Sequence, residues 1–372
     1  MGKGKYLRKE KVSVGKKIGR AALIILLIIV LLIGAVAAFV WSKLGKISYD
    51  DGSYKETIAP TVAVDMQTEP TDILIEATTA VTEAPTEPEA IVNMDDLTME
   101  TAPNYSSGEL FKDKDVMNIL LIGSDERTEG FTDNSRSDLN LLVSINKAKK
   151  TVKLVSFSRG IAIKMLDGPY KGSYEWLTNA QRWAGPEAVM EAMEDAFKIE
   201  LNRYVRVNFN SVVEIVDAMG GIDIEMSEAE VKFFNNKWDT NYVAGMNKLY
   251  GRSALLFARL RGVDDDWNRM ERQRKCILAV VNKLKGSSFS ELNDLCDLAL
   301  SMIRTNLTKM EIAELILYSP KFLESEFDQM TIPLENSYSG MKVFSGAGGW
   351  ALDYDKNNKA LHEFLFGSYN AD

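Results

Sequence analysis

The sequence predicts an α/β fold: a layered α-β-α domain with a central mixed sheet, preceded by one transmembrane helix and a disordered stalk. Three observations lead there. Strand-like apolar segments alternate with amphipathic helix-like segments over residues 116–372. A single long apolar run lies at 21–41. A Thr-, Glu- and Pro-rich segment at 42–115 separates this run from residues 116–372.

Residues 21–41 are long enough as a helix to cross a bilayer, at about 1.5 Å per residue. In residues 1–20, basic side chains outnumber the one acid, Glu10, so the positive-inside rule places this tail in the cytoplasm and the rest of the chain outside the cell membrane. The alternative is a cleaved signal peptide, since Ala35-Val36-Ala37 resembles a processing site. The length of the run, which continues to Trp41, favours an uncleaved, single-pass signal anchor.

Residues 42–115 form the expected extracytoplasmic linker. The segment is acidic and contains few apolar residues that could offset the entropy of ordering, so we expect disorder. Its like charges keep such a chain extended. A spacer is therefore the preferred interpretation over an acidic motif that a partner recognises.

The domain at 116–372 is expected to alternate strands and helices. The segment VMNILLIG at 116–123 has the apolar run and terminal glycine of a buried strand. Pro186 begins a helix whose apolar stripe, Val189, Met190, Met193 and Phe197, is expected to be core rather than part of a lipid tunnel. Further strands are predicted at 139–145, 152–157, 222–226 and near 329–333, and further helices at 211–219, 250–260, 270–284, 307–318 and 359–366.

Composition excludes several classes of function. The net charge of −9 and the lack of a basic stripe in the outer domain argue against nucleic acid. His362 is the only histidine and is expected on the surface or in packing, which argues against hydrolases with an imidazole base and against histidine-rich zinc sites. Cys276 and Cys296 lie in helix-like patterns and are expected to be core residues, with one disulfide as the alternative.

Arginine, aspartate and glutamine carry the remaining chemistry. Asp125 follows the first strand, Arg136 and Asp138 precede the second, and Arg159 ends the third. In a hairpin-like sheet these turns would meet. Open α/β sheets tend to place ligands at the carboxyl ends of their strands.

A second group lies further along, with Arg259 and Arg261 before a loop and Arg269, Arg272 and Gln273 at a predicted helix start. The spacing of the last three is expected to place them on one helix face. Asp264, Asp265 and Asp266 between them could pair with arginines or hold a metal. Guanidinium groups bind compact anions through bidentate hydrogen bonds, so the first hypothesis is a phosphate or pyrophosphate ligand. A surface ion-pair network of little energetic value is the alternative.

The outer domain resembles the LytR-CpsA-Psr family of cell-wall ligases from about residue 118 to 283. Seven stretches carry the resemblance in order: NILLIGSDER, RSDLNLLVSIN, TVKLVSFSRG, AGPEAVMEAMEDAF, YVRVNFNSVVEIVDAMGGIDIEM, GMNKLYGRSALLFARLR and DWNRMERQRKCI. The resemblance implies a phosphotransferase that moves a glycopolymer from an undecaprenyl pyrophosphate carrier to peptidoglycan through a phosphodiester bond. It also implies an apolar tunnel for the polyprenyl chain between the sheet and helices.

The resemblance also implies residue roles. It assigns Asp125 and Asp138 to magnesium, or manganese in its place. From the chemistry, either an aspartate near the metal, with Asp138 as first choice, or the departing phosphate accepts the hydroxyl proton, and loss of Arg159 or Arg261 is expected to abolish transfer. The pyrophosphate-binding residues that the resemblance implies are Arg136, Arg159, Arg259, Arg261, Arg269 and Gln273, supported by Asp266, Arg127 and Arg272.

Two positions depart from the family pattern. Ser158-Arg159-Gly160 stands where the family commonly shows Pro-Arg-Asp, and Asn179 stands where members often have histidine. The first departure keeps two alternatives open: a lipid-pyrophosphate hydrolase and a non-catalytic, membrane-anchored sensor of wall precursors. Which polymer is transferred (teichoic acid, capsule or another anionic glycan) and the oligomeric state are left open by the sequence.

Overall fold

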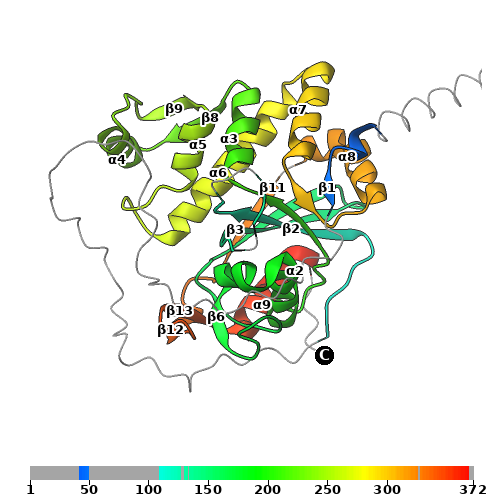
Figure 1. Ribbon diagram of the computed structural model, residues 1–372, viewed down its shortest axis with the longest axis vertical. Helices are drawn as coiled ribbons and strands as arrows, with labels where there is room; N and C mark the ends of the chain where they lie inside the picture. Colours follow the sequence, from blue (N-terminus) through cyan, green and yellow to red (C-terminus); the bar gives the residue numbers. More distant parts are fainter. Residues whose placement is uncertain (1–41, 50–108, 127–129, 133, 326, 368–372) are drawn as a thin grey trace, which may run out of the picture. The chain divides into compact units, whose positions relative to one another are not determined.

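The computed structural model describes residues 42–49, 109–126, 130–132, 134–325 and 327–367 (Figure 1). The predicted cytoplasmic tail, the anchor at 21–41 and residues 50–108 of the predicted linker lie outside these residues. Ser48–Tyr49, which were expected to belong to a disordered linker, form a strand of the central sheet, so the prediction of disorder is wrong at these two residues. Within the described part, no helix is both long and apolar enough to span a bilayer. Residues 42–44 are helical and belong to a unit ending at Lys46, and everything below concerns the unit that begins at Ile47.

A seven-stranded mixed sheet forms the centre of this unit. Its order is β1-β10-β7-β2-β3-β4-β11. The strands are β1 (Ser48–Tyr49), β2 (Val116–Ser124), β3 (Ser137–Asn146), β4 (Thr151–Phe157), β7 (Arg203–Val207), β10 (Arg304–Thr305) and β11 (Phe327–Ile332). Neighbours pair antiparallel at β10/β7, β2/β3 and β3/β4, and parallel at β1/β10, β7/β2 and β4/β11. The predicted mixed sheet is confirmed.

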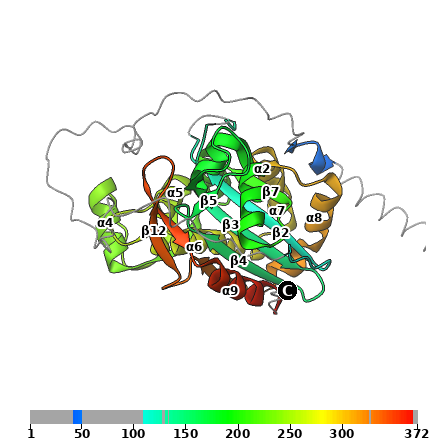
Figure 2. The same ribbon diagram turned by 90° about the horizontal axis from the view of Figure 1, so that it is seen from below.

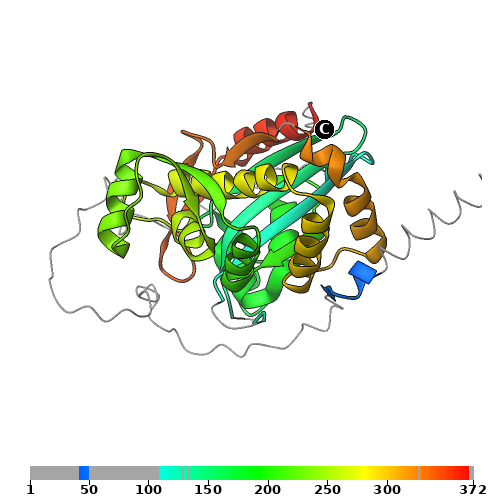
Figure 3. The same ribbon diagram turned by 90° about the horizontal axis from the view of Figure 1, so that it is seen from above.

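Helices cover both faces of the sheet. Figures 1 and 2 show α2 (Leu177–Phe197) and α9 (Tyr354–Phe366) on one side. Figures 1 and 3 show on the other side α3 (Phe209–Ala218), α5 (Gly251–Ala258), α6 (Asp266–Lys285), α7 (Phe289–Ser301) and α8 (Lys309–Leu323). Beyond these layers are α4 (Glu228–Trp238) and three hairpins, β5 (Ala162–Lys164) with β6 (Tyr174–Trp176), β8 (Ile222–Met226) with β9 (Gly245–Leu249), and β12 (Tyr338–Lys342) with β13 (Gly348–Leu352). The α-β-α layering is confirmed.

The main core fills the space between the sheet and α2. Leu120, Leu142 and Val155 of the sheet are fully buried there, together with Val189 and Met193 of α2. Met190 and Phe197 belong to the same cluster. The apolar stripe of this helix is therefore core, as predicted.

Helix α2 contains a break that the sequence explains. Gly185 has φ 80°, a left-handed conformation that favours glycine, and Pro186 follows it. Because proline has no amide hydrogen and a fixed φ, it suits the first turn of a helix. The predicted start at Pro186 is thus the second of two helical segments.

Helix α6 begins one turn earlier than predicted, at Asp266 rather than Met270. The side chain of Asp265 accepts a hydrogen bond from the backbone N–H of Asn268 at 3.0 Å and caps the helix. Arg269 consequently lies inside the helix, past its first turn. The short β7, α4 and α7 were not predicted from the sequence.

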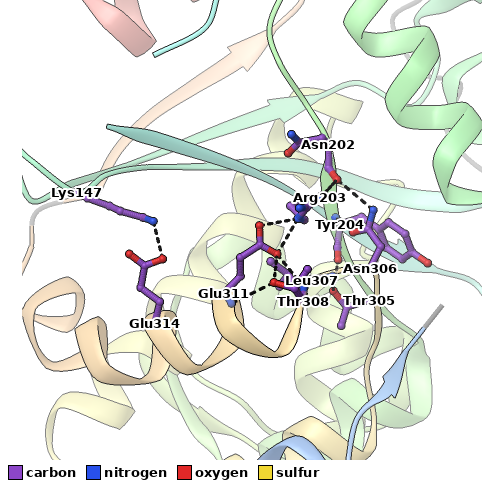
Figure 4. Close-up of polar contacts among 10 residues, drawn as sticks. All are labelled: Lys147, Asn202, Arg203, Tyr204, Thr305, Asn306, Leu307, Thr308, Glu311 and Glu314. Atoms are coloured by element: carbon purple, nitrogen blue, oxygen red, sulfur yellow. Dashed lines mark hydrogen bonds and ion pairs between the residues drawn. The ribbon is translucent and has the colours of Figure 1, made fainter. Parts of the chain in front are cut away.

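Helix α8 is tied to the sheet by polar contacts near β7 (Figure 4). Arg203 Nε donates to both carboxylate oxygens of Glu311 at 2.8 Å. Glu311 also forms a capping box with Thr308 at the helix start. Lys147 Nζ pairs with Glu314 at 2.8 Å. These contacts fix α8 against β7 and against the β3–β4 turn.

The histidine and cysteines have packing roles. His362 is buried and its Nε2 lies 2.9 Å from the carbonyl oxygen of Phe197, so the packing interpretation is confirmed. Cys276 and Cys296 are both partly buried, and neither forms a disulfide. The alternative of a disulfide between them is therefore wrong.

Candidate functional site

Strand order brings the predicted turns to one edge of the sheet. β2 and β4 run in the same direction and β3 runs against both, so the end of β2, the start of β3 and the end of β4 coincide. The register pairs Ser124 with Ser137, next to Asp125 and Asp138. The expected meeting of the three turns is confirmed.

Asp125 and Arg136 are held together by backbone hydrogen bonds. The Asp125 N–H donates to the Arg136 carbonyl at 3.2 Å, and the Arg136 N–H donates to Asp125 Oδ1 at 2.8 Å. The two residues therefore close the β2–β3 connection. This places a carboxylate and a guanidinium at the same edge.

Asp138 is the centre of the arginine group. Arg159 Nη1 lies 3.1 Å from Asp138 Oδ1. Burial would raise the pKa of Asp138, but the positive charges of Arg159, Arg269, Arg261 and Arg259 together lower it. Four arginines that are up to 110 positions apart in the sequence thus surround one carboxylate.

Asp266 supports two of these arginines. Its Oδ1 lies 2.6 Å from Arg269 Nη2 and 3.9 Å from Arg159 Nε, and its Oδ2 accepts from Ser158 Oγ at 3.3 Å. Burial lowers the pKa of Arg269 to about 10, opposed by the charge of Asp266. The guanidinium therefore stays protonated at neutral pH.

Gln273 and Arg272 are adjacent on α6 but form hydrogen bonds with different parts of the protein. Gln273 Nε2 donates to the Asp138 carbonyl at 3.4 Å and so reaches the arginine group. Arg272 instead donates to both oxygens of Asp264, at 2.6 and 2.7 Å, and to Glu230 of α4. The three residues Arg269, Arg272 and Gln273 lie within little more than one turn of α6 and are all buried, as their spacing predicts, but Arg272 contacts the preceding loop and α4 instead of the arginine group. Arg127 lies outside the described residues.

The three successive aspartates do not act as one group. Asp264 binds Arg272, Asp265 caps α6, and Asp266 pairs with Arg269. Across the described ranges there is no cluster of three or more acidic, histidine or cysteine side chains arranged to hold a metal. The suggestion that these aspartates form a metal site is not supported.

Arg206 on β7 is a site residue that sequence reasoning missed. It is fully buried, pairs with Glu126, and donates to the Ser135 hydroxyl and the Thr132 carbonyl at 2.7 Å each. It thereby joins the start and end of the connection that carries Asp125 and Arg136. One available signal was the alternation in β7, which places Arg206 on the same side as the buried Tyr204.

Arg182 of α2 is a second residue that was missed. Its Nε donates to Asn134 Oδ1 at 2.7 Å. Burial lowers its pKa, and the neighbouring charge of Arg136 lowers it further, whereas that of Asp125 raises it. Arg182 therefore adds positive charge beside the β2–β3 connection.

An apolar cavity of about 180 Å³ lies between the sheet and α3, α5 and α6 (Figure 3 shows these helices). Asp138, Arg259 and Gln273 contribute to its polar part. The Arg259 guanidinium lies 4.2 Å from the centre of the Phe209 ring, and both residues line the cavity. Its apolar lining includes Val212, Ile215 and Val216 of α3, Ala254, Leu255 and Ala258 of α5, and Ile277 and Val280 of α6. The cavity thus continues from the arginine group into an apolar interior.

Asp125 and Asp138 are the two carboxylates at this edge that could hold a divalent cation. Burial raises the pKa of Asp125, and the negative charge of Asp138 raises it further. A divalent cation would offset this negative charge. Magnesium is typically held by one or two carboxylates together with substrate phosphates, which is the donor set available here.

Both departures from the family pattern have a local structural setting. Ser158 donates to Asp266, and Gly160 lies under the Trp350 side chain. Asn179 is fully buried and its Nδ2 donates to Glu175 Oε1 at 3.1 Å. Asn179 therefore holds a buried carboxylate.

Known proteins place the chain in a family. A model of the LytR_cpsA_psr family matches residues 76–360, and the chain belongs to this family. Over 240 residues it is 28% identical to TagU of Enterococcus faecalis, named a polyisoprenyl-teichoic acid–peptidoglycan teichoic acid transferase, covering 63% of this chain and 77% of that protein. The protein of the same name from Bacillus cereus is 29% identical over 217 residues, covering 57% and 67%.

Solved structures share the fold. Protein gbs0355 of Streptococcus agalactiae has a TM-score of 0.57 at 23% identity, covering 67% of this chain and 86% of that one. The LytR-CPS2A-psr family protein YwtF (TagT) with bound octaprenyl pyrophosphate lipid has a TM-score of 0.51 at 22% identity, covering 71% and 96%. The layered architecture is therefore that of the family.

Proposed function

We propose that this protein is a phosphotransferase that attaches an anionic glycopolymer from a polyprenyl-pyrophosphate carrier to peptidoglycan. The observation that carries the proposal is the apolar cavity whose polar part includes Arg259, Asp138 and Gln273. A lipid pyrophosphate has the same two parts, an apolar chain and a compact polyanion. The bound lipid named for YwtF (TagT) and the transferase name of TagU support the assignment.

The arginines would bind the pyrophosphate and neutralise charge as it develops. Arg159, Arg259, Arg261 and Arg269 surround Asp138, and Asp266 orients two of them. Forked guanidinium donors suit phosphate oxygens, and phosphoryl transfer depends mainly on positioning and electrostatic stabilisation. Arg136 would add a donor from the β2–β3 connection.

The reaction would join an acceptor hydroxyl to the sugar-proximal phosphorus. The oxygen of that hydroxyl, on the C6 of N-acetylmuramic acid in the family analogy, forms the new P–O bond as the bond to the bridging oxygen breaks. The lipid monophosphate leaves with the electron pair. Asp138 is the carboxylate beside Arg159, yet the surrounding arginines lower its pKa, which favours the departing phosphate as acceptor of the hydroxyl proton.

Asp125 and Asp138 would hold magnesium, or manganese in its place. When bound, the ion would supply positive charge to the phosphate oxygens. The chain's own residues would keep the two carboxylates together, through the hydrogen bond from the Arg136 N–H to Asp125 and the ion pair between Arg159 and Asp138.

The proposed location is the outer surface of the cell membrane. The apolar run at 21–41 would anchor the chain with its amino terminus in the cytoplasm, and the domain would work outside, where peptidoglycan lies.

The test replaces arginines of the group in the purified protein. Arg159→Ala and Arg261→Ala are each expected to abolish transfer from a lipid-linked donor to peptidoglycan while the thermal unfolding transition is retained. Arg252→Ala, at an exposed position of α5, is the matched control and should transfer normally. Full transfer by both site variants would refute the proposal.

Two controls separate the alternatives. Donor is incubated with and without peptidoglycan, and release of free glycan regardless of acceptor would identify a hydrolase. Binding of a pyrophosphate analogue with no product under either condition, and no response to magnesium, would identify a sensor instead.

A further inference from the structure

Three aromatic side chains from separate elements gather beside the arginine group. Trp267 lies in the first turn of α6, Tyr338 in β12 and Trp350 in β13. The Tyr338 ring centre is 5.3 Å from that of Trp267 and 5.1 Å from that of Trp350, and the two indoles are 6.0 Å apart. All three are partly exposed. We call these three residues the aromatic trio.

The trio is connected to the site at two points. Trp267 directly follows Asp266, whose carboxylate lies 2.6 Å from Arg269. The Trp350 N–H donates to the carbonyl of Gly160 at 2.9 Å, and Gly160 directly follows Arg159. The trio is therefore linked through the backbone to Asp266 and Arg159, two residues of the proposed site.

Gly160 makes room for one of the rings. A Cβ atom at this position would lie 3.2 Å from Trp350 Nε1 and 3.3 Å from its Cδ1, closer than side chains normally pack. A larger residue would press on the indole. The glycine in Ser158-Arg159-Gly160 thus brings an aromatic surface directly against the backbone beside Arg159.

The β12–β13 hairpin is held firmly in place. Trp176 Nε1 donates to the Gly348 carbonyl at 2.8 Å, and Glu175 accepts from the N–H and hydroxyl of Ser345 at 2.9 and 3.0 Å. Trp267 Nε1 donates to the Pro333 carbonyl at 3.3 Å, which fixes its ring. A surface ordered in advance loses little entropy when a ligand binds.

The chemistry around the trio differs from that of the arginine group. Burial raises the pKa of Tyr338, and the nearby negative charges of Asp265 and Glu335 raise it further. Both of these carboxylates are exposed. Aromatic faces suit the C–H face of a pyranose ring, and carboxylates accept hydrogen bonds from sugar hydroxyls. A phosphate would be repelled.

We propose that Trp267, Tyr338 and Trp350 form a binding site for a sugar ring of the acceptor glycan. This inference rests on the proposed function. The acceptor is favoured over the donor because the donor's lipid would occupy the cavity lined from α3, α5 and α6, whereas the trio is formed by the start of α6 and the β12–β13 hairpin. A glycan on the trio would extend to the arginine group from outside the cavity.

The experiment measures acceptor and donor dependence separately. Trp267→Ala and Tyr338→Ala are each expected to raise the KM for a soluble, uncross-linked peptidoglycan glycan fragment about three- to tenfold, as expected for the loss of one aromatic contact. The KM for the lipid-linked donor should not change. Trp267→Phe keeps a ring and should recover most of the acceptor affinity, which a purely structural role would not require.

Phe344→Ala is the matched control. Phe344 is 51% exposed at the tip of the same hairpin and packs against Tyr170 instead of the trio. It should leave both KM values unchanged. A rise in donor KM with constant acceptor KM would show that the donor glycan occupies the trio and would overturn the assignment, as would unchanged acceptor KM in both alanine variants.

Direct binding distinguishes failure of this inference from failure of the proposed function. Titration of the protein with the same glycan fragment, without donor, should change tryptophan fluorescence in the wild type and less in Tyr338→Ala. Binding without any transfer would keep the sugar site and refute the transferase. Transfer without such binding, at fragment concentrations above the acceptor KM, would refute the sugar site alone.

Discussion

Replacing Arg206 by methionine is expected to destabilise the domain severely. The side chains of Arg206 and Glu126 are 0% and 2% exposed, so the variant would leave the Glu126 carboxylate buried without its cation. It would also remove the donors to Ser135 and to the Thr132 carbonyl. Breaking a buried ion pair by removing one partner costs about 3–5 kcal/mol. Total stabilities of domains are only about 5–15 kcal/mol, so the loss is a large fraction.

A double variant tests the cause of that loss. Urea unfolding of Arg206→Met, Glu126→Gln and the pair together should show the double variant recovering much of the stability that Arg206→Met loses, because no uncompensated charge then remains. Arg203→Met is the matched control on the same strand. Its partly exposed pair with Glu311 should contribute only about 0–1 kcal/mol.

Two results would refute this reasoning: Arg206→Met losing no more stability than Arg203→Met, or the double variant being no more stable than Arg206→Met. A functional effect should accompany the structural one. Since Arg206 joins Glu126 to the end of the connection that carries Asp125 and Arg136, the folded fraction of Arg206→Met should bind a pyrophosphate analogue more weakly by isothermal titration calorimetry.

Three further predictions follow from the cavity, a buried carboxyl and a helix cap. Ala254→Phe should fill the cavity, which weakens binding of an octaprenyl pyrophosphate but not of inorganic pyrophosphate in calorimetric titrations; equal loss for both would contradict the lipid assignment. Burial raises the pKa of Glu175 above 4.5 despite hydrogen bonds from its neighbours. The folded state therefore holds the protonated carboxyl at low pH, and the free energy of unfolding decreases as pH rises through the raised pKa and the carboxyl ionises. Glu175→Gln, which cannot ionise, should therefore gain stability relative to the wild type from pH 4.5 to neutrality, and a pH-independent difference in urea unfolding would refute this. Glu311→Ala removes both the ion pair with Arg203 and the capping box of α8, with an expected loss of about 1–2 kcal/mol in urea unfolding, and no loss would mean that these contacts contribute nothing.

Much of the element pattern could be read from short stretches of chain. The apolar runs of β2 and β4 and the stop signals around β8 depend on residues within a few positions of one another. Pro186 marked a helix start for the same reason, although the break at Gly185 joined two segments into α2. The start of α6 was misplaced by a turn because the Asp265 cap was not weighed against the apolar pattern.

The polar residues at strand ends, Asp125, Asp138 and Arg159, were identifiable as candidate ligands because their types and positions are local properties of the sequence. Their mutual distances were not, since those depend on the order and direction of β2, β3 and β4. Arg269 and Arg272 show that the sequence does not predict the partner of each side chain. Both lie on α6, yet only the packing of α4 and the preceding loop decides that Arg272 turns away to Glu230 and Asp264.

The sequence by itself determined the fold class and the residue types: an acidic α/β domain with arginines and carboxylates at a few turns. What only the tertiary structure decided is which of them share a dielectric environment and a cavity. Arg206 and the aromatic trio could be recognised only once strands and hairpins distant in the chain had packed together. Burial and charge proximity are set by contacts between residues far apart in sequence, and local propensity carries no information about those contacts.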